Sequence, residues 1–181
     1  MTTFGSAQSA GYDRRATRLL GSLYRRIATD IDTATTHGAT VVDIGTGPGK
    51  LLSTLATRRP DLRLHGIDLS PHMIEIAHRN LDGHPAELAV ADVDDLPYPD
   101  ASIDLAVSSL SMHEWPDLAT ATRELHRILR PGGTLAIYDF RFTRTTAIQQ
   151  ALRAGFGTVD TETVRLPWHP VAVITRYRAT A

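Results

Sequence analysis

The sequence contains no cysteine. This absence excludes disulfide bonds, thiolate metal sites and cysteine nucleophiles, and it fits a reducing compartment. Long apolar runs are missing too, since all of them are far shorter than the ~20 residues that a membrane-spanning helix needs. The N-terminal segment MTTFGSAQSAGYDRRA lacks both the basic and the apolar region of a secretory signal peptide. We therefore expect a soluble, cytoplasmic protein without a membrane span.

An excess of charge of either sign is also absent. The formal net charge is -1 at pH 7, with 22% charged and 42% hydrophobic residues. Such a chain has no global basic field that would favour nucleic acid or an anionic membrane. Its 181 residues and ordinary hydrophobic content fit one globular domain. The histidines are scattered without metal-ligand spacing, so we expect no metal site.

What the sequence does contain is an alternation of strand-like and helix-like segments. Leu19, Leu23, Ile27 and Ile31 recur at helical spacing ahead of Gly38. From there on, β-branched runs alternate with amphipathic ones. The predicted helices cover residues 12–36, 50–59, 71–81, 117–129 and 145–154, and the predicted strands cover 40–45, 62–68, 86–92, 102–110, 134–140, 156–166 and 170–179.

This order of elements predicts an α/β fold with a doubly wound, mostly parallel sheet and helices on both faces. Only PWHP separates the last two strand-like runs, so these strands are expected to pair antiparallel as a hairpin. In open sheets of this kind, ligands bind beyond the carboxyl ends of the strands. The loop after the first strand is therefore the prime candidate site.

That loop, DIGTGPGK at residues 43–50, has glycine at alternate positions after an acid. It is not a P-loop, because position 44 is isoleucine instead of glycine and position 51 is leucine instead of Ser or Thr. It also lacks the third glycine of a dinucleotide fingerprint, since residue 50 is lysine. A carboxylate at Asp43 would repel a pyrophosphate. We therefore expect a ligand that is cationic or neutral here, with Asp43 as a fixed anion at the entrance of the pocket.

In this loop the sequence resembles the class I S-adenosylmethionine-dependent methyltransferases, whose first motif is an acid, any residue and then GxGxG. Asp68 in HGIDLS, Asp92 in ADVDDLPYPDASID and the run RILRPGG follow in the family's order. The RILRPGG run is similar to the branch that includes the ubiquinone and menaquinone biosynthesis methyltransferases. The resemblance covers about residues 40–140.

The resemblance implies a Rossmann-like, seven-stranded sheet with an antiparallel C-terminal hairpin. It also implies S-adenosyl-L-methionine as cofactor and S-adenosyl-L-homocysteine as product. The chain 1–181 would be a single methyltransferase domain with an N-terminal helical cap at 1–37, a cofactor-binding core at 38–140 and a C-terminal helix and strand hairpin at 141–181.

The resemblance assigns the cofactor-binding residues as well. In the family, the acid that ends the second strand accepts both ribose hydroxyls, which gives that role to Asp68. Asp92 would face the adenine amino group, with a backbone contact from Val93. The expected set is Tyr12, Asp43, Gly45, Thr46, Gly47, Gly49, Asp68, Leu69, Met73, Asp92, Val93 and Ser109, with Leu69 and Met73 on the adenine face.

Several of these residues have a purely structural alternative. The three glycines could form only a tight turn, Asp68 could be an anion at a helix start, and Asp92 could belong to a solvated acidic loop. Either Ser108 or Ser109 could offer its backbone to the methionine moiety. Tyr12 could shield the sulfonium by a cation–π contact or could anchor the first helix.

His113 is the candidate catalytic residue, because it follows the fourth strand at the expected mouth of the site. A neutral imidazole there could take a proton from a substrate hydroxyl or amine. Alternatively, His113 begins a helix and shapes the pocket. Asp139, Arg141 and Arg144 follow the fifth strand, where the two arginines could meet a substrate carboxylate or phosphate or could face solvent.

The expected function is methyl transfer to a small-molecule nucleophile. The alternatives are a catalytically silent S-adenosylmethionine-binding or regulatory module of the same fold, and a nicotinamide-dependent oxidoreductase. A nucleic-acid acceptor is not favoured, since there is no basic stripe and SSLS stands where an Asn-Pro-Pro-Tyr-like sequence would be. The sequence does not indicate the acceptor or the oligomeric state.

Overall fold

The fold is described from a computed structural model, in which residues 20–165 and 173–181 are described. Tyr12 and the predicted start of the first helix lie outside these residues. The helices are α2 (Gly21–Ala34), α3 (Lys50–Arg58), α4 (Pro71–Asn80), the 3-10 turn η1 (Met112–Glu114), α5 (Leu118–Ile128) and α6 (Thr145–Phe156). The strands are β1 (Thr40–Ile44), β2 (Arg63–Asp68), β3 (Glu87–Val90), β4 (Ile103–Ser109), β5 (Leu129–Phe140), β6 (Asp160–Val164) and β7 (Ile174–Thr180).

The described strands form one sheet of seven in the order β3-β2-β1-β4-β5-β7-β6. Strands β1 to β5 pair in parallel, whereas β7 runs antiparallel to both β5 and β6. The predicted doubly wound sheet with an antiparallel C-terminal hairpin is therefore confirmed. Strand order reverses between β1 and β4, so the carboxyl ends of these two strands mark the expected ligand position.

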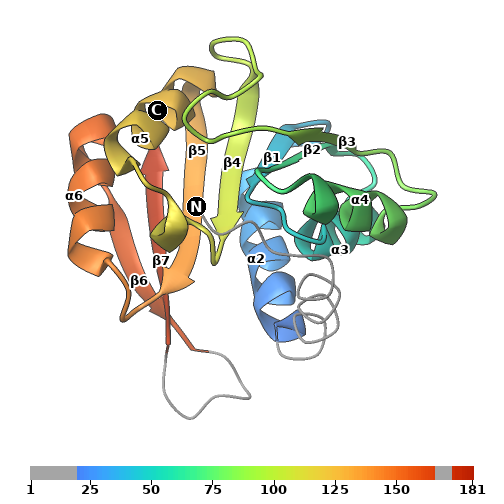
Figure 1. Cartoon of the computed structure of the whole chain (residues 1–181), viewed down its shortest axis with the longest axis horizontal. Helices are drawn as coiled ribbons and strands as arrows, with labels where there is room; N and C mark the ends of the chain where they lie inside the picture. The colour runs from blue at the N-terminus through green and yellow to red at the C-terminus, as the bar shows by residue number, and fades with distance from the viewer. Residues whose placement is uncertain (1–19, 166–172) are drawn as a thin grey trace.

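Both faces of the sheet are covered by helices (Figure 1). One apolar cluster joins α2 and α3 to the sheet, and its α2 members Leu23, Ile27 and Ile31 are those that the helical spacing predicts to be inward. The second cluster joins α5 and α6 to the opposite face. Figure 1 shows α5 and α6 side by side at one end of the sheet, over β5 and β7. The two apolar clusters on opposite faces of the sheet thus fix the positions of the strand ends.

Helix starts follow local capping chemistry. Ser70 precedes α4 and its Oγ accepts a hydrogen bond from the backbone N–H of Met73, while Pro71 takes the first helical position. Asp117 precedes α5 and accepts from the N–H groups of Ala119 and Thr120. These caps fix where the loops after β2 and β4 end.

Some predicted boundaries are wrong. Strand β5 begins at Leu129, directly after α5, and not at residue 134. The reason is tertiary: Leu129 pairs with Ile103 of β4, and Gly132 and Gly133 exchange backbone hydrogen bonds with Ala181, which continues the pairing of β5 with β7. Helix α6 continues to Phe156, so that β6 starts only at Asp160. Strand β3 is shorter than expected, at residues 87–90.

No helix among the described residues is long and apolar enough to cross a membrane. The division at 37 and 140 into cap, core and C-terminal part stays a prediction.

Candidate functional site

The three glycines of the loop after β1 share a left-handed backbone conformation but differ in their surroundings. Gly45, Gly47 and Gly49 have φ values of +71°, +52° and +71°, a region that side-chain-bearing residues rarely adopt. A Cβ on Gly45 would lie 2.1 Å from Oγ of Ser111, and one on Gly49 would lie 3.0 Å from Cβ of Ala77. A Cβ on Gly47 would meet no atom within 4 Å. Gly45 and Gly49 are therefore needed for packing, and only Gly47 faces open space that a ligand could fill.

Asp43 lies beneath this loop and not at the entrance of a pocket. Its side chain is buried at 1% exposure, and Oδ2 accepts a hydrogen bond of 2.9 Å from the Thr46 hydroxyl. The other oxygen, Oδ1, is buried without a hydrogen-bond partner among the described residues. Burial raises the pKa of Asp43 to about 7, with a further contribution from the charge of Asp68. The expectation of a fixed anion at the entrance is therefore corrected: the acid is internal and only partly charged near pH 7.

Asp68 ties the end of β2 to the glycine loop. Its carboxylate accepts hydrogen bonds from the backbone N–H of Gly47 at 2.8 Å and of Ser70 at 2.9 Å. Burial raises the pKa of Asp68, while these two N–H groups act in the opposite direction. Since a carboxylate offers about four acceptor positions, two contacts leave room for hydroxyl donors.

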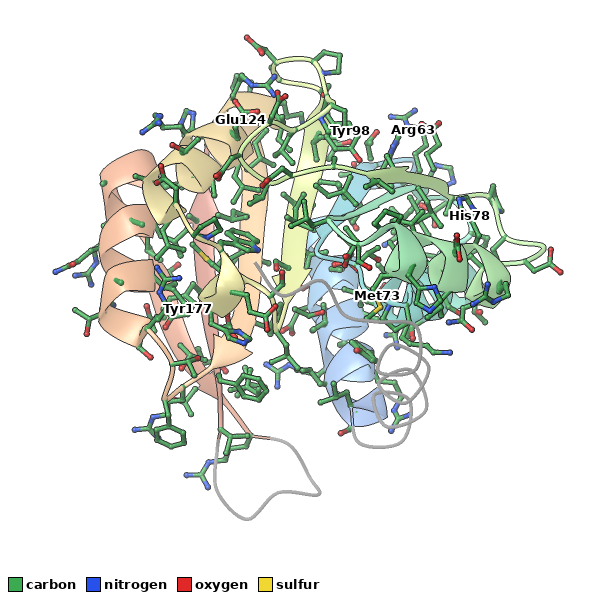
Figure 2. All side chains as sticks on the ribbon, viewed as in Figure 1. Arg63, Met73, His78, Tyr98, Glu124 and Tyr177 are labelled. Atoms are coloured by element: carbon green, nitrogen blue, oxygen red, sulfur yellow. The ribbon has the colours of Figure 1, made fainter. Side chains whose placement is uncertain are left out.

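The predicted nucleoside side is only partly exposed. Leu69 is 46% exposed at the end of β2, whereas Met73, labelled on α4 in Figure 2, is buried at 5%. Val93 is buried as well, and Asp92 accepts a hydrogen bond from the N–H of Asp94. Of the two apolar residues expected on the adenine face, the structure thus leaves only Leu69 with an open surface.

Val90 is a candidate that the sequence reading missed. It pairs in register with Asp68 and is 51% exposed. Its position could have indicated this role, because Val90 is a large apolar residue between Ala89 and Ala91 at the end of the third strand.

The end of β4 distinguishes the two serines. Ser108 is completely buried and its hydroxyl has no partner among the described residues, whereas Ser109 is half-buried. Leu110 follows with a φ of +57°, and its N–H donates to the carbonyl of Tyr138 on β5. This strained turn directs the chain into η1. Ser109 is therefore the more accessible of the two.

His113 is held by a buried carboxylate from the neighbouring strand. Asp139, at the end of β5, is 0% exposed and accepts hydrogen bonds from the backbone N–H of His113 at 2.7 Å and from the N–H of Phe140 at 2.7 Å. Nδ1 of His113 lies 2.8 Å from Oδ1 of Asp139. A carboxylate only accepts hydrogen bonds, so Nδ1 carries the proton and the lone pair of a neutral ring lies on Nε2. Nε2 is 3.9 Å from Glu114, beyond hydrogen-bond range.

The two arginines after β5 have different surroundings. Nη1 of Arg144 donates to the carbonyl oxygens of Trp115 at 2.6 Å and His113 at 3.3 Å. Arg144 thus braces the loop that carries His113. The guanidinium of Arg141 lies 5.9 Å from the centre of the Phe142 ring, within cation–π range.

The structure brings most of the predicted site together at one edge of the sheet. The residues that end or follow the parallel strands at this edge are Gly47, Asp68, Leu69, Ser109 and His113. Among the described residues, no group of three or more His, Cys, Asp or Glu side chains could hold a metal ion.

This combination of a 3-2-1-4-5-7-6 sheet and an acid–GxGxG loop defines a methyltransferase-type Rossmann domain. A family model described as "Methyltransferase domain" matches residues 42–137. The chain therefore belongs to the class I S-adenosylmethionine-dependent methyltransferases.

Individual relatives agree with this family. A malonyl-[acyl-carrier protein] O-methyltransferase of Dechloromonas aromatica is 38% identical over 138 residues, which are 76% of this chain and 48% of the relative. A demethylmenaquinone methyltransferase of Thermus thermophilus is 32% identical over 102 residues, 55% of this chain and 46% of the relative. The chain thus spans about half the length of the curated relatives it matches.

A solved structure is similar over almost the full length. The crystal structure of a putative S-adenosyl-L-methionine-dependent methyltransferase from Methanococcus maripaludis matches this chain with a TM-score of 0.80 and 25% sequence identity. The match covers 99% of this chain and 94% of the Methanococcus maripaludis chain.

Proposed function

We propose that the chain transfers the methyl group of S-adenosylmethionine to an oxygen, nitrogen or carbon nucleophile of a small molecule, with His113 as the base. The observation that carries this proposal is the hydrogen bond between Nδ1 of His113 and the buried Asp139. A surface histidine that only shapes a pocket has no need for a buried carboxylate behind it. This pair fixes the ring and stabilises the positive charge that the ring acquires when it accepts a proton.

The residues at the glycine loop fit the cofactor. Gly47 leaves open space beside its backbone, and the unpaired oxygen of Asp43 lies under the same loop. Asp68 retains acceptor positions for ribose hydroxyls. Leu69 and Val90 offer exposed apolar surface on the side where the adenine ring of the cofactor would lie. When bound, S-adenosylmethionine supplies an electrophilic methyl group on a positively charged sulfur. A buried acid that can lose its proton suits that charge better than it suits a phosphate.

The protein's own contribution is positioning and acid–base chemistry. Leu110 and η1 bring His113 to the end of β4, next to the glycine loop, because Gly45 lacks the Cβ that would collide with Ser111. Correct placement of two reactants can lower the barrier by several kcal/mol, and a positioned base contributes about 10²–10⁴-fold. Arg144 maintains this placement from the side of α6.

A small acceptor is favoured over nucleic acid for two reasons. The net charge is -1, so no basic field attracts phosphates. The relatives are named for a malonyl group on a carrier protein and for demethylmenaquinone, and neither of these is a nucleic acid.

The test uses methyl-labelled S-adenosylmethionine with a pool of small molecules extracted from cells. We expect a labelled product with the wild type and at least a 100-fold lower rate with His113→Gln. His78→Gln is the matched control, since His78 is an exposed histidine on α4, labelled in Figure 2. If the protein binds S-adenosylmethionine but labels nothing in any pool, the alternative of a catalytically silent module holds instead.

A further inference from the structure

The second half of the glycine loop packs against the end of α4. One face of this helix carries Ala77, Asn80 and Leu81, which lie three and four residues apart. A Cβ added to Gly49 would lie 3.0 Å from Cβ of Ala77 and 3.2 Å from Cδ1 of Leu81. Nδ2 of Asn80 donates a hydrogen bond of 2.8 Å to the carbonyl oxygen of Pro48. One helical face therefore contacts two consecutive residues of the loop.

The carbonyl of Pro48 depends on this side chain for its hydrogen bond. The helix that follows, α3, begins at Lys50, and its Ser53 N–H donates to the carbonyl of Gly49 and not to that of Pro48. Within the part of the chain that the structure describes, no backbone N–H donates to the Pro48 carbonyl. Pro48 is a buried residue, and buried backbone carbonyls need a partner. Asn80 is that partner, although it lies 32 residues further along the chain.

The same helix connects the two points at which the loop is held. Asp68 precedes α4 and accepts from the N–H of Gly47, whereas Asn80 is the last residue of α4 and donates to Pro48. Figure 1 shows α4 next to α3, the helix that continues from the loop. The ten residues of α4 form a stiff spacer about 15 Å long. The position of the loop relative to Asp68 is therefore set by α4.

The two points of attachment serve different parts of the cofactor. Asp68 and Leu69 end or follow β2, on the side of the nucleoside in the proposed site. The glycine loop follows β1, which is the next strand toward β4. The part of S-adenosylmethionine beyond the ribose therefore extends over the loop, where Gly47 leaves open space beside its backbone. That part comprises the sulfonium and the amino acid end.

We propose that Asn80 is a positioning residue that holds the glycine loop in place for the amino acid end of S-adenosylmethionine, acting through the carbonyl of Pro48. This inference rests on the cofactor half of the proposed function and is independent of the acceptor and of His113. Loss of the donor leaves the Pro48 carbonyl unpaired, and the loop must move to bring it to water. The moved loop binds the amino acid end less well, while the nucleoside side, held by Asp68, is unchanged.

The first experiment measures the affinity for S-adenosylhomocysteine by calorimetric titration of the full chain and its folded variants. Asn80→Asp keeps the shape of the side chain but places an oxygen against the carbonyl of Pro48, so we expect roughly tenfold weaker binding. Asn80→Ala admits water to the carbonyl and should weaken binding by only about threefold. Arg79→Gln is the control, because Arg79 is an exposed neighbour on α4 and its replacement changes the net charge by the same amount. Its affinity should equal that of the wild type.

The second experiment separates positioning of the loop from a general weakening of α4. The same proteins are titrated with 5′-methylthioadenosine, which has the nucleoside and the sulfur but lacks the amino acid end. We expect Asn80→Asp to bind this ligand as well as the wild type does. A distorted α4 would weaken both ligands alike, since Asp68 and Leu69 adjoin the same helix. Equal losses for the two ligands would therefore overturn the proposal.

The wild-type titrations distinguish failure of this inference from failure of the proposed function. If the wild type and both Asn80 variants bind S-adenosylhomocysteine equally well, the role of Asn80 is wrong while the cofactor site stands. If the wild type binds neither ligand, the cofactor site fails and this inference fails with it. If Asn80→Asp does not fold, the comparison of the two ligands is made with Asn80→Ala, and the same outcomes decide it.

Discussion

Replacing Asp43 with asparagine tests whether the buried acid of the glycine loop is mostly uncharged below neutral pH. Burial raises the pKa of Asp43 from 3.8 to about 7. The folded protein therefore binds more protons than the unfolded chain between these two values. Stability from this source is fully present below about pH 4, falls as the pH rises, and is lost above about pH 7. A gap of about three pH units corresponds to ~4 kcal/mol.

Asparagine cannot ionise, and its side-chain oxygen can still accept the hydrogen bond from Thr46. We therefore expect Asp43→Asn to have nearly the stability of the wild type at pH 4 and to be more stable at pH 8, by up to ~4 kcal/mol or roughly 10 °C in Tm. The assay is thermal and guanidinium unfolding of both proteins at several pH values. Asp95→Asn, which removes an exposed carboxylate, is the charge-matched control.

The reasoning is refuted if Asp43→Asn and the wild type differ by the same amount at pH 4 and pH 8, or if the variant is the less stable protein at pH 8. The same substitution bears on the ligand. A carboxylate that loses its proton when a cation binds makes the affinity for S-adenosylmethionine rise with pH, and Asp43→Asn should remove that pH dependence.

Two further predictions concern the glycine loop and the α2 interface. Gly49→Ala places a Cβ 3.0 Å from Cβ of Ala77 at a φ of +71°, so we expect a loss of unfolding free energy of ~2 kcal/mol by chemical denaturation. Gly47→Ala meets no atom within 4 Å, and it should lower stability by only ~1 kcal/mol while weakening cofactor binding. An equal effect of both substitutions on stability would contradict the distinction between packing and ligand glycines. Tyr138→Phe removes the hydroxyl that donates to Asp30 at 2.7 Å, and a destabilisation of about 1–2 kcal/mol is expected; no change in the unfolding midpoint would mean that this buried contact is not formed in solution.

The sheet could be predicted from the sequence because its signals are local. The β-branched run at 40–45 and the cap at Ser70 each specify a nearby conformation, and the alternation of such segments specifies the order of elements. The start of β5 could not be predicted in this way. It depends on the pairing of Leu129 with Ile103 of β4 and on hydrogen bonds that Gly132 and Gly133 exchange with Ala181, which lies almost fifty residues further along the chain.

The candidate site also has features that local sequence predicts and features that depend on tertiary contacts. The glycine spacing and Asp68 are read directly from motifs, and His113 from its place after a strand. His113 and Asp139 are 26 residues apart, and their contact joins the ends of two neighbouring strands. Neither local segment indicates this contact. The burial of Asp43 and Met73 was missed for a related reason: a sequence gives the position of a residue along a loop or helix, while its depth depends on what packs above it.

The measurement that tests the central claim most directly is a calorimetric titration of the protein with S-adenosylmethionine, repeated with Asp68→Ala. The wild type should bind one equivalent with a micromolar Kd, and the variant should lose the heat signal while its circular dichroism spectrum is unchanged. Absence of heat with the wild type at high-micromolar ligand, or undiminished binding by Asp68→Ala, would contradict the assignment of the cofactor to the carboxyl edge of this sheet.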